Sequence, residues 1–282
     1  AIIAASFANI ALDLLFVMGF GWGIFGASFA TVLAQLIAFL LCLRSLRRLP
    51  FVQLTKADWK TDPAILLHLC RLGIPTGLQM SMITLGGMVL QSVLNGFGVV
   101  FVAGYTAADK LYGILESASV AFGYAMTAYM GQNRGARNAA RIDTGIRAVL
   151  VLSIGFTAAI VATMLLAGKP LLGLFLSTEE AGAADALAVA HRYLMVLMAF
   201  LLALFVLQAY RSSLQGLGEM TVPTLSGFAE MLMRMGAALV LPTFIGQSGV
   251  FFAEGAAWVC AAALNLVWYY MRIGKIKRDM LK

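Results

Sequence analysis

Eight long apolar runs constrain the fold of this chain more than any other feature of its sequence. A helix needs about 20 apolar residues to cross the hydrocarbon core of a bilayer. Only 12% of the 282 residues are charged, which is about half the share usual in a soluble domain. The sequence therefore predicts an all-α membrane protein, a multi-span helical bundle. The expected spans are residues 1–19, 24–43, 74–96, 99–130, 141–167, 186–210, 221–244 and 249–272.

The reactive side chains of the sequence are few and scattered. Cys42, Cys70 and Cys260 have no regular spacing, which argues against a disulfide framework or a zinc site. His68 and His191 lie far apart in the chain and form no metal-binding pair. The sequence also has no phosphate-binding loop and no nucleophile elbow. We therefore expect no enzyme activity, no catalytic residue, no bound metal and no cofactor.

Lysine and arginine are distributed unequally between the two ends of the expected spans. Sixteen of the 20 basic residues lie at one end, whereas only Lys169 and Arg192 lie at the other. Basic connections stay on the cytoplasmic side, so we expect a multi-pass protein of the inner (cell) membrane with a cytoplasmic C-terminus. This distribution explains the net charge of +7 without a nucleic-acid partner. The sixteen residues are Arg44, Arg47, Arg48, Lys56, Lys60, Arg71, Arg134, Arg137, Arg141, Arg147, Arg211, Arg272, Lys275, Lys277, Arg278 and Lys282.

The first two expected helices resemble the last two in sequence. The stretch FAN at 7–9 matches FAE at 228–230, and GASFAT at 26–31 matches GVFFAE at 249–254 after a loop that is two residues longer. Six helices separate equivalent positions, so both copies point the same way through the membrane, as in a parallel repeat. The polar residues at mirrored positions are Asn9 and Glu230, Asp13 and Arg234, and Thr31 and Glu254.

Five regions, in order, resemble the MATE (multidrug and toxic compound extrusion) family of transporters. They correspond to the family's fifth-to-sixth helix region, its entry to the seventh helix, its eighth helix and the following cytoplasmic loop, and its tenth-to-eleventh helix region. The match extends over the whole chain. The motifs are NIALD at 9–13 with GWGIFGA at 21–27, RLGIP at 71–75, YTAADK at 105–110 with GQNRGA at 131–136, LQGLG at 214–218 and SGFAE at 226–230.

The resemblance implies twelve helices in two six-helix lobes that face a central cavity. It implies alternating-access export of amphipathic, cationic drugs or toxins in exchange for sodium ions or protons. The chain begins inside an apolar run without a methionine, so we expect a piece of a longer protein that lacks roughly the first four helices and is monomeric when complete. The expected parts are the last two helices of the first lobe at 1–43, a cytoplasmic linker at 44–63, the second lobe at 64–272 and a basic cytoplasmic tail at 273–282.

One departure from the family concerns the coupling cation. Some MATE groups place acidic residues on the seventh and tenth helices. Here the run 74–96 carries Gln79, Gln91 and Asn95 but no acid, and the tenth-helix equivalent has no charge from Tyr193 to Tyr210. A cation site built from those two helices is therefore not expected in this chain.

Six charged residues lie inside the expected spans of the second lobe. Each costs about 2.5–3.5 kcal/mol at a helix centre, so they should face the bundle interior or water. From helical rise and depth, Arg234 should bridge Glu230, four residues earlier, and Glu254 on the next helix. Two interpretations remain open, a structural ion-pair network and a relay or cation site. An excess of two acids favours the second, because an unmatched carboxylate can carry a proton or bind sodium. The six are Asp109, Lys110, Glu116, Glu230, Arg234 and Glu254, of which Glu116, Glu230, Arg234 and Glu254 are the candidates for ion coupling.

Polar residues at helical spacing follow one face of the expected helix 99–130. We interpret this face as the lining of a cavity; the alternative is close packing of small residues against a neighbouring helix. A second polar stripe, on the span 74–96, could line the same space. The cavity-lining candidates are Asp109, Lys110, Tyr112, Ser119, Thr84, Met88, Gln91 and Asn95, together with Glu116 and Gly123 of the first stripe.

Two other functions are alternatives to drug export. A related flippase for lipid-linked saccharides would favour a strongly cationic cavity, whereas the balance of charges within the expected spans is acidic. A membrane-embedded enzyme would need a nucleophile, a base or a metal set inside the spans. We therefore expect a transporter of small organic molecules that is embedded in the lipid bilayer.

Overall fold

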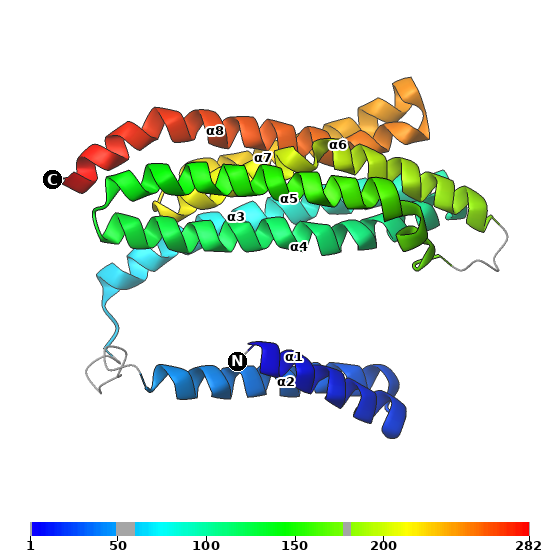
Figure 1. The fold of residues 1–282 in the computed structure, drawn as a ribbon, viewed down its shortest axis with the longest axis horizontal. Coiled ribbons are helices and arrows are strands. Elements are labelled where there is room, and N and C mark those ends of the chain that lie inside the picture. Colours follow the sequence, from blue (N-terminus) through cyan, green and yellow to red (C-terminus); the bar gives the residue numbers. More distant parts are fainter. Residues whose placement is uncertain (1, 49–59, 177–181, 282) are drawn as a thin grey trace. The chain divides into compact units, whose positions relative to one another are not determined.

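The computed structural model describes residues 2–48, 60–176 and 182–281. In this part of the chain almost every residue is helical and no strand is present, which confirms the predicted all-α class. The chain divides into two compact units, Ala1–Leu66 and Leu67–Lys282 (Figure 1). Residues 49–59 of the expected linker at 44–63 lie outside the described part of the chain, as does Lys282.

The first unit is a helical hairpin. Helix α1, Ile2–Asp13, continues into a π-helical turn, η1, Leu14–Gly19, and α2, Gly23–Leu46, returns alongside it. The Phe16 ring stacks on Trp22 with ring centroids 5.2 Å apart. Gly26 lets the start of α2 touch η1, because a Cβ at this position would lie 3.1 Å from the Phe16 carbonyl carbon.

The second unit consists of six long helices that run alongside one another (Figure 1). Two short 3-10 turns, η4 at Asn95–Phe97 and η5 at Gln247–Phe251, precede the fourth and eighth helices. All eight expected spans coincide with described helices. The six helices of this unit are α3 Pro63–Leu94, α4 Val99–Gly135, α5 Ala139–Gly173, α6 Ala183–Gly216, α7 Thr221–Ile245 and α8 Phe252–Leu281.

Seven helical segments of the described chain are long and apolar enough to cross a membrane by length and composition. Helix α4 is not among them, although its 37 residues make it the longest helix described. Its first half carries Asp109, Lys110 and Glu116. Helix α4 is therefore more polar than its neighbours, and the groups that its polar side chains face matter for the function.

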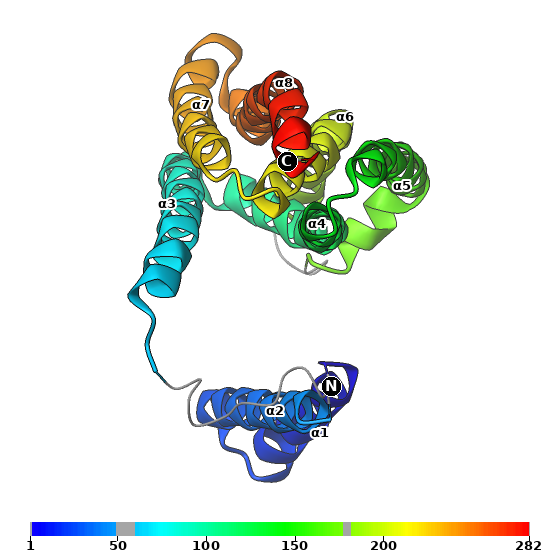
Figure 2. The same ribbon diagram turned by 90° about the vertical axis from the view of Figure 1, so that its left-hand side faces the viewer.

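Helix α6 lies at the centre of the second unit and packs against α4, α5 and α8 (Figure 2). Tyr193 of α6 stacks on Tyr105 of α4 with ring centroids 4.3 Å apart, and its hydroxyl donates to the Tyr105 hydroxyl at 2.9 Å. Gly104 brings the two helices together, because a Cβ there would strike the carbonyl oxygen of Ala186. Small residues permit such close helix contacts inside membranes.

Helix α3 is held to the second unit by specific polar contacts. Thr224 Oγ1 of α7 donates to the Pro75 carbonyl at 3.1 Å, and Gln215 Nε2 of α6 donates to Gln79 Oε1 at 2.9 Å. Gly86 allows α3 to approach α7, since a Cβ at this position would lie 3.2 Å from Met231 Cα. These contacts place the middle of α3 beside the charged residues of α7.

Candidate functional site

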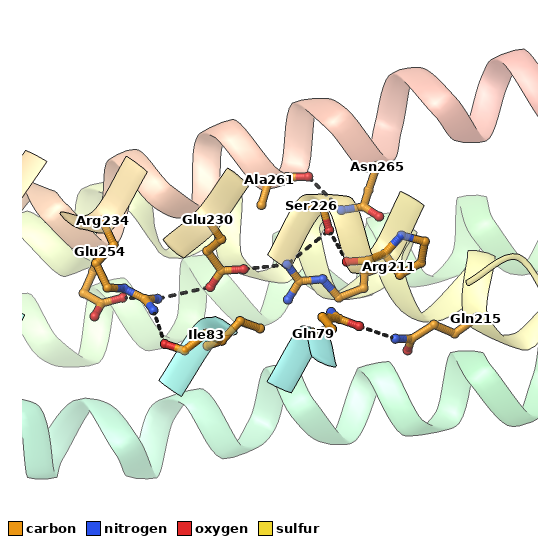
Figure 3. Close-up of polar contacts among 11 residues, drawn as sticks. Gln79, Ile83, Arg211, Gln215, Ser226, Glu230, Arg234, Glu254, Ala261 and Asn265 are labelled. Carbon is orange, nitrogen blue, oxygen red and sulfur yellow. Dashed lines mark hydrogen bonds and ion pairs between the residues drawn. The ribbon is translucent and has the colours of Figure 1, made fainter. Parts of the chain in front are cut away.

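The buried carboxylate of Glu230 is held by two arginines (Figure 3). Arg211 Nη2 of α6 lies 2.5 Å from Glu230 Oε2, and Arg234 Nη2 of α7 lies 3.1 Å from Oε1. The three side chains are 4–7% exposed. Each carboxylate oxygen therefore has its own cationic partner, which is the arrangement that a buried charge requires.

Arg234 joins three helices at one guanidinium. Besides Glu230, its Nη2 contacts Glu254 Oε2 of α8 at 2.8 Å, and its Nη1 donates to the Ile83 carbonyl of α3 at 3.0 Å (Figure 3). The pair with Glu230 follows from the four-residue spacing on α7, and η5 turns the chain so that Glu254, in the first turn of α8, lies beside it. The expected contacts of Arg234 with both acids are thus present.

Arg211 is the residue of this network whose burial the sequence did not predict. The expected span ends at Tyr210, which places Arg211 in the connection after the helix, but α6 continues to Gly216 and the Arg211 side chain is 7% exposed. The local signal for the true end of the helix is Gly218, whose φ of 73° is the left-handed conformation typical of the residue after a helix.

A cavity of about 370 Å³ opens beside this network, between α3, α4, α6 and α7. Its wall combines charged groups, carboxamides and hydroxyls with apolar side chains. Glu116 of α4 is part of the wall and forms no ion pair with any residue that the structure describes. The polar wall residues are Thr76, Gln79, Glu116, Tyr124, Thr127, Gln208, Arg211, Ser212, Gln215, Glu230 and Arg234.

The charge balance of the site differs from the expected excess of two acids. Glu116, Glu230 and Glu254 face the two guanidinium groups of Arg211 and Arg234, so the cluster has one negative charge more than positive. The difference arises because Arg211 is buried here; Asp109 and Lys110 are exposed, and their opposite charges cancel in the count. Within the described residues, no group of three His, Cys, Asp or Glu side chains could hold a metal ion.

The other cavity-lining candidates lie away from this cavity. On α4, Tyr112 and Ser119 are buried; Tyr112 packs on Trp258 with ring centroids 5.4 Å apart. Glu116 and Gly123 of the same stripe do line the cavity. The second stripe is exposed on α3, where Gln91 Nε2 donates to Asn95 Oδ1 at 3.1 Å. The α3 residues that line the cavity instead include Thr76, Gln79 and Ile83, and the exposed ones are Thr84, Met88, Gln91 and Asn95.

Two of the three mirrored positions in the first unit line a pocket. Asn9 of α1 and Thr31 of α2 line a pocket of about 350 Å³ within this unit. One turn after Asn9, the Oδ1 atom of Asp13 is buried and has no hydrogen-bond partner among the described residues. In the internal repeat, the position of Asp13 in the first unit therefore corresponds to that of Arg234 in the second unit.

A comparison with protein families identifies the chain. The family model described as MatE matches residues 75–240, which is more than half of the sequence. The chain belongs to the MatE family. The match includes α4, α5 and α6 and most of α3 and α7, so it contains both arginines of the network and every residue of the cavity wall except Trp258.

This MatE chain is similar to named relatives over nearly all of its length. It is 31% identical over 273 residues to the probable multidrug resistance protein YpnP of Bacillus subtilis (strain 168), covering 95% of this chain and 59% of the relative. It is 22% identical over 278 residues to the multidrug export protein MepA of Staphylococcus saprophyticus, covering 96% and 59%. The chain thus spans about three fifths of the length of these curated relatives.

Solved MATE structures share the fold of this MatE chain. A MOP superfamily transporter from Pyrococcus furiosus Vc1 (DSM3638) superposes with a TM-score of 0.88 at 25% identity, covering 97% of this chain and 61% of that one. A MATE transporter solved in complex with MaL6 gives a TM-score of 0.88 at 24% identity, covering 97% and 62%. The resemblance to the family that the sequence motifs indicated is confirmed.

Proposed function

We propose that the complete protein is a secondary active transporter that exports amphipathic, cationic drugs or toxins in exchange for sodium ions or protons by alternating access. Membership in the MatE family and the names of the relatives support this proposal. The observation that carries it is the single unmatched negative charge beside a cavity in the membrane-spanning part of the chain. A coupling cation requires such a charge, and lipid does not supply one.

Among the acids of the second unit, Glu116 is the one we propose to hold the coupling ion. Glu230 has both oxygens engaged by arginines, and Glu254 shares Arg234 with it. Glu116 has no such partner in the described chain and lies on the cavity wall. Glu230, Arg234 and Glu254 then set the electrostatic environment of Glu116 and position the helices around it.

The first unit offers a second candidate place for the coupling ion. The buried, unpartnered Oδ1 of Asp13 and the nearby Asn9 side chain supply oxygen atoms of the kind that bind sodium, or a carboxylate that can take a proton. In this respect the two units differ, because the second carries a guanidinium at the mirrored position. In that case the first lobe would bind the coupling ion and the second lobe would bind the drug.

We also propose that the C-terminus is cytoplasmic and that the protein resides in the inner (cell) membrane. Even when the buried Arg211 is left out of the count, fifteen basic residues lie at the proposed cytoplasmic end and two at the other end. Basic residues near helix ends determine orientation. Cysteine accessibility at Lys275 and Lys169, measured with a membrane-impermeant reagent on whole cells, tests this orientation.

Ion-dependent dye efflux tests the transport function. Vesicles that contain the full-length protein are loaded with a cationic dye, and a sodium gradient and a proton gradient are applied separately. We expect one gradient to drive efflux, and Glu116→Gln and Asp13→Asn identify the lobe that uses it. Absence of dye movement under both gradients would contradict the proposal.

Nothing in the second unit, as far as the structure describes it, favours a flippase for lipid-linked saccharides. Such a carrier would favour a strongly cationic cavity, whereas two arginines and two glutamates line this one. The drug-export proposal accommodates both signs of charge, because the arginines neutralise Glu230 and leave Glu116 available to a cation.

A further inference from the structure

Arg211 has donor capacity that its protein partners do not use. Its Nη2 contacts Glu230 at 2.5 Å and Ser226 Oγ at 3.4 Å. Its Nε is buried without a partner, and Nη1 makes no hydrogen bond with any residue that the structure describes. The side chain is 7% exposed and lies on the cavity wall. A buried guanidinium with unused N–H groups is a site for an acceptor, because unsatisfied buried donors are costly.

Arg234, the other arginine of the wall, is engaged much more fully. Its Nη1 and Nη2 donate to Ile83 O, Glu230 Oε1 and Glu254 Oε2, and only its Nε is buried without a partner among the described residues. The arginine N–H groups that remain available to a ligand are therefore mainly those of Arg211, whose charge is already paired with Glu230. The negative charge that remains available is at Glu116, since Glu230 is bound on both oxygens.

The two available charges lie at different heights in the cavity. Gly123 of α4 contacts Ser212 of α6, next to Arg211, because a Cβ on Gly123 would lie 2.8 Å from Ser212 Oγ. Glu116 precedes Gly123 by seven residues, which is about 10 Å along a helix. The cavity therefore has a positive end near Arg211 and a negative end near Glu116. Carboxamides from Gln79, Gln208 and Gln215 also line its wall.

We propose that this cavity binds an amphoteric ligand, a small organic molecule whose anionic group meets Arg211 and whose cationic group meets Glu116. A simple cation leaves the Arg211 donors unsatisfied, and a simple anion leaves the half-buried Glu116 without an ion-pair partner. A zwitterion satisfies both, and its own charges need no separate neutralisation. The proposal rests on the proposed transport function only for the fate of the ligand, and it narrows the substrate class for the second lobe.

Equilibrium binding to the purified full-length protein tests the inference with three probes on one scaffold. The probes are 4-(aminomethyl)benzoate, which is a zwitterion, its methyl ester, which is a monocation, and its N-acetyl derivative, which is a monoanion. We expect the zwitterion to bind at least about tenfold more tightly than either blocked probe, because each blocked probe loses one charge-assisted contact. Equal or tighter binding of the ester or the N-acetyl probe, or no saturable binding of the zwitterion, overturns the inference.

Two variants test which residue binds each charged group of the ligand. Glu116→Gln should bring binding of the zwitterion down to that of the monoanion, and this residue has no ion pair in the described chain whose loss would unfold the protein. Arg211→Lys keeps a charge beside Glu230 but lacks the spare donors of a guanidinium, so the preference over the ester should fall about tenfold. The exposed α6 residues Asp185 and Arg192 supply matched controls, Asp185→Asn and Arg192→Lys, which should retain the wild-type preference. An unchanged preference in Glu116→Gln would contradict the assignment even if Arg211→Lys fails to fold.

The binding assay tests the amphoteric site, and the efflux assay tests the transport function, so each proposal can fail without the other. Ion-driven efflux together with preferred binding of the ester would sustain the transport function and refute the amphoteric site. Preferred binding of the zwitterion without ion-driven efflux would do the reverse.

Discussion

The guanidinium of Arg211 lies 2.5 Å from the carboxylate of Glu230, and both side chains are buried in the second unit. Removal of one partner of a buried pair leaves a charge without compensation, which typically costs about 3–5 kcal/mol. Arg234 still neutralises Glu230 in part, so we expect Arg211→Gln to destabilise the protein toward the lower end of this range. Thermal unfolding of the purified protein, followed by fluorescence-detected gel filtration, measures the fall in Tm.

The double variant Arg211→Gln/Glu230→Leu is the control for this prediction. It removes both members of the pair, and we expect it to leave Arg234 with Glu254 as its remaining acid. Its Tm should therefore fall by less than the sum of the two single variants. A single variant Arg211→Gln as stable as the wild type would show that the pair contributes nothing.

Glu116→Gln should separate folding from ion coupling. Because Glu116 has no ion pair in the described chain, we expect a change in stability within about 0.5 kcal/mol and an unchanged Tm. In the vesicle assay, efflux should lose most of its response to the driving ion gradient. Retention of the full response would exclude Glu116 as the carboxylate that couples transport.

Glu254→Gln should instead lower the stability of the protein and leave ion coupling intact. The introduced carboxamide can still accept from Arg234, but a neutral hydrogen bond replaces a charge-assisted one, a loss of about 1 kcal/mol. We expect a moderate fall in Tm and a retained response to the ion gradient, because Glu230 continues to hold Arg234 at 3.1 Å. Loss of the gradient response in a variant of normal Tm would move the coupling role from Glu116 to Glu254.

The contact between α4 and α6 can be tested with two glycines of one helix. A Cβ on Gly104 would strike the carbonyl oxygen of Ala186, whereas a Cβ on Gly113 meets nothing within 4 Å. Gly104→Ala should therefore lower Tm and the yield of monodisperse protein. Gly113→Ala should leave Tm unchanged or raise it slightly, because alanine favours a helix over glycine by about 1 kcal/mol. Equal effects of the two changes would contradict the observed packing.

Hydropathy predicted the helices well because length and apolar content are local properties of the sequence. The run 221–244 became α7, Thr221–Ile245, and the spacing of Glu230 and Arg234 on that helix made their contact predictable. Glu254 required a further step, the estimate of depth from the opposite end of α8. The fold class and this part of the site therefore follow from the sequence alone.

Other parts of the site depend on tertiary packing, which hydropathy does not contain. Arg211 lies beyond the apolar run of α6, and its burial follows from the position of α7 beside it. On α3, two polar faces compete, one with Gln79 and one with Gln91, and neighbouring helices decide which of them is covered. A single sequence does not rank these faces, so it could not predict that the Gln79 face lines the cavity of the second unit.

The Arg234 guanidinium has a mechanical consequence for the second unit. It fastens α7 to α8 through Glu254 and to α3 through the Ile83 carbonyl, and Gly86 leaves room for it on α3. Because one side chain contacts all three helices, they can tilt together, but they cannot slide past one another without breaking the buried ion pair or the hydrogen bond to Ile83. Any rearrangement that opens the cavity must therefore bend or displace α4 and α6, or break the contacts of Arg234 with α3 and α8.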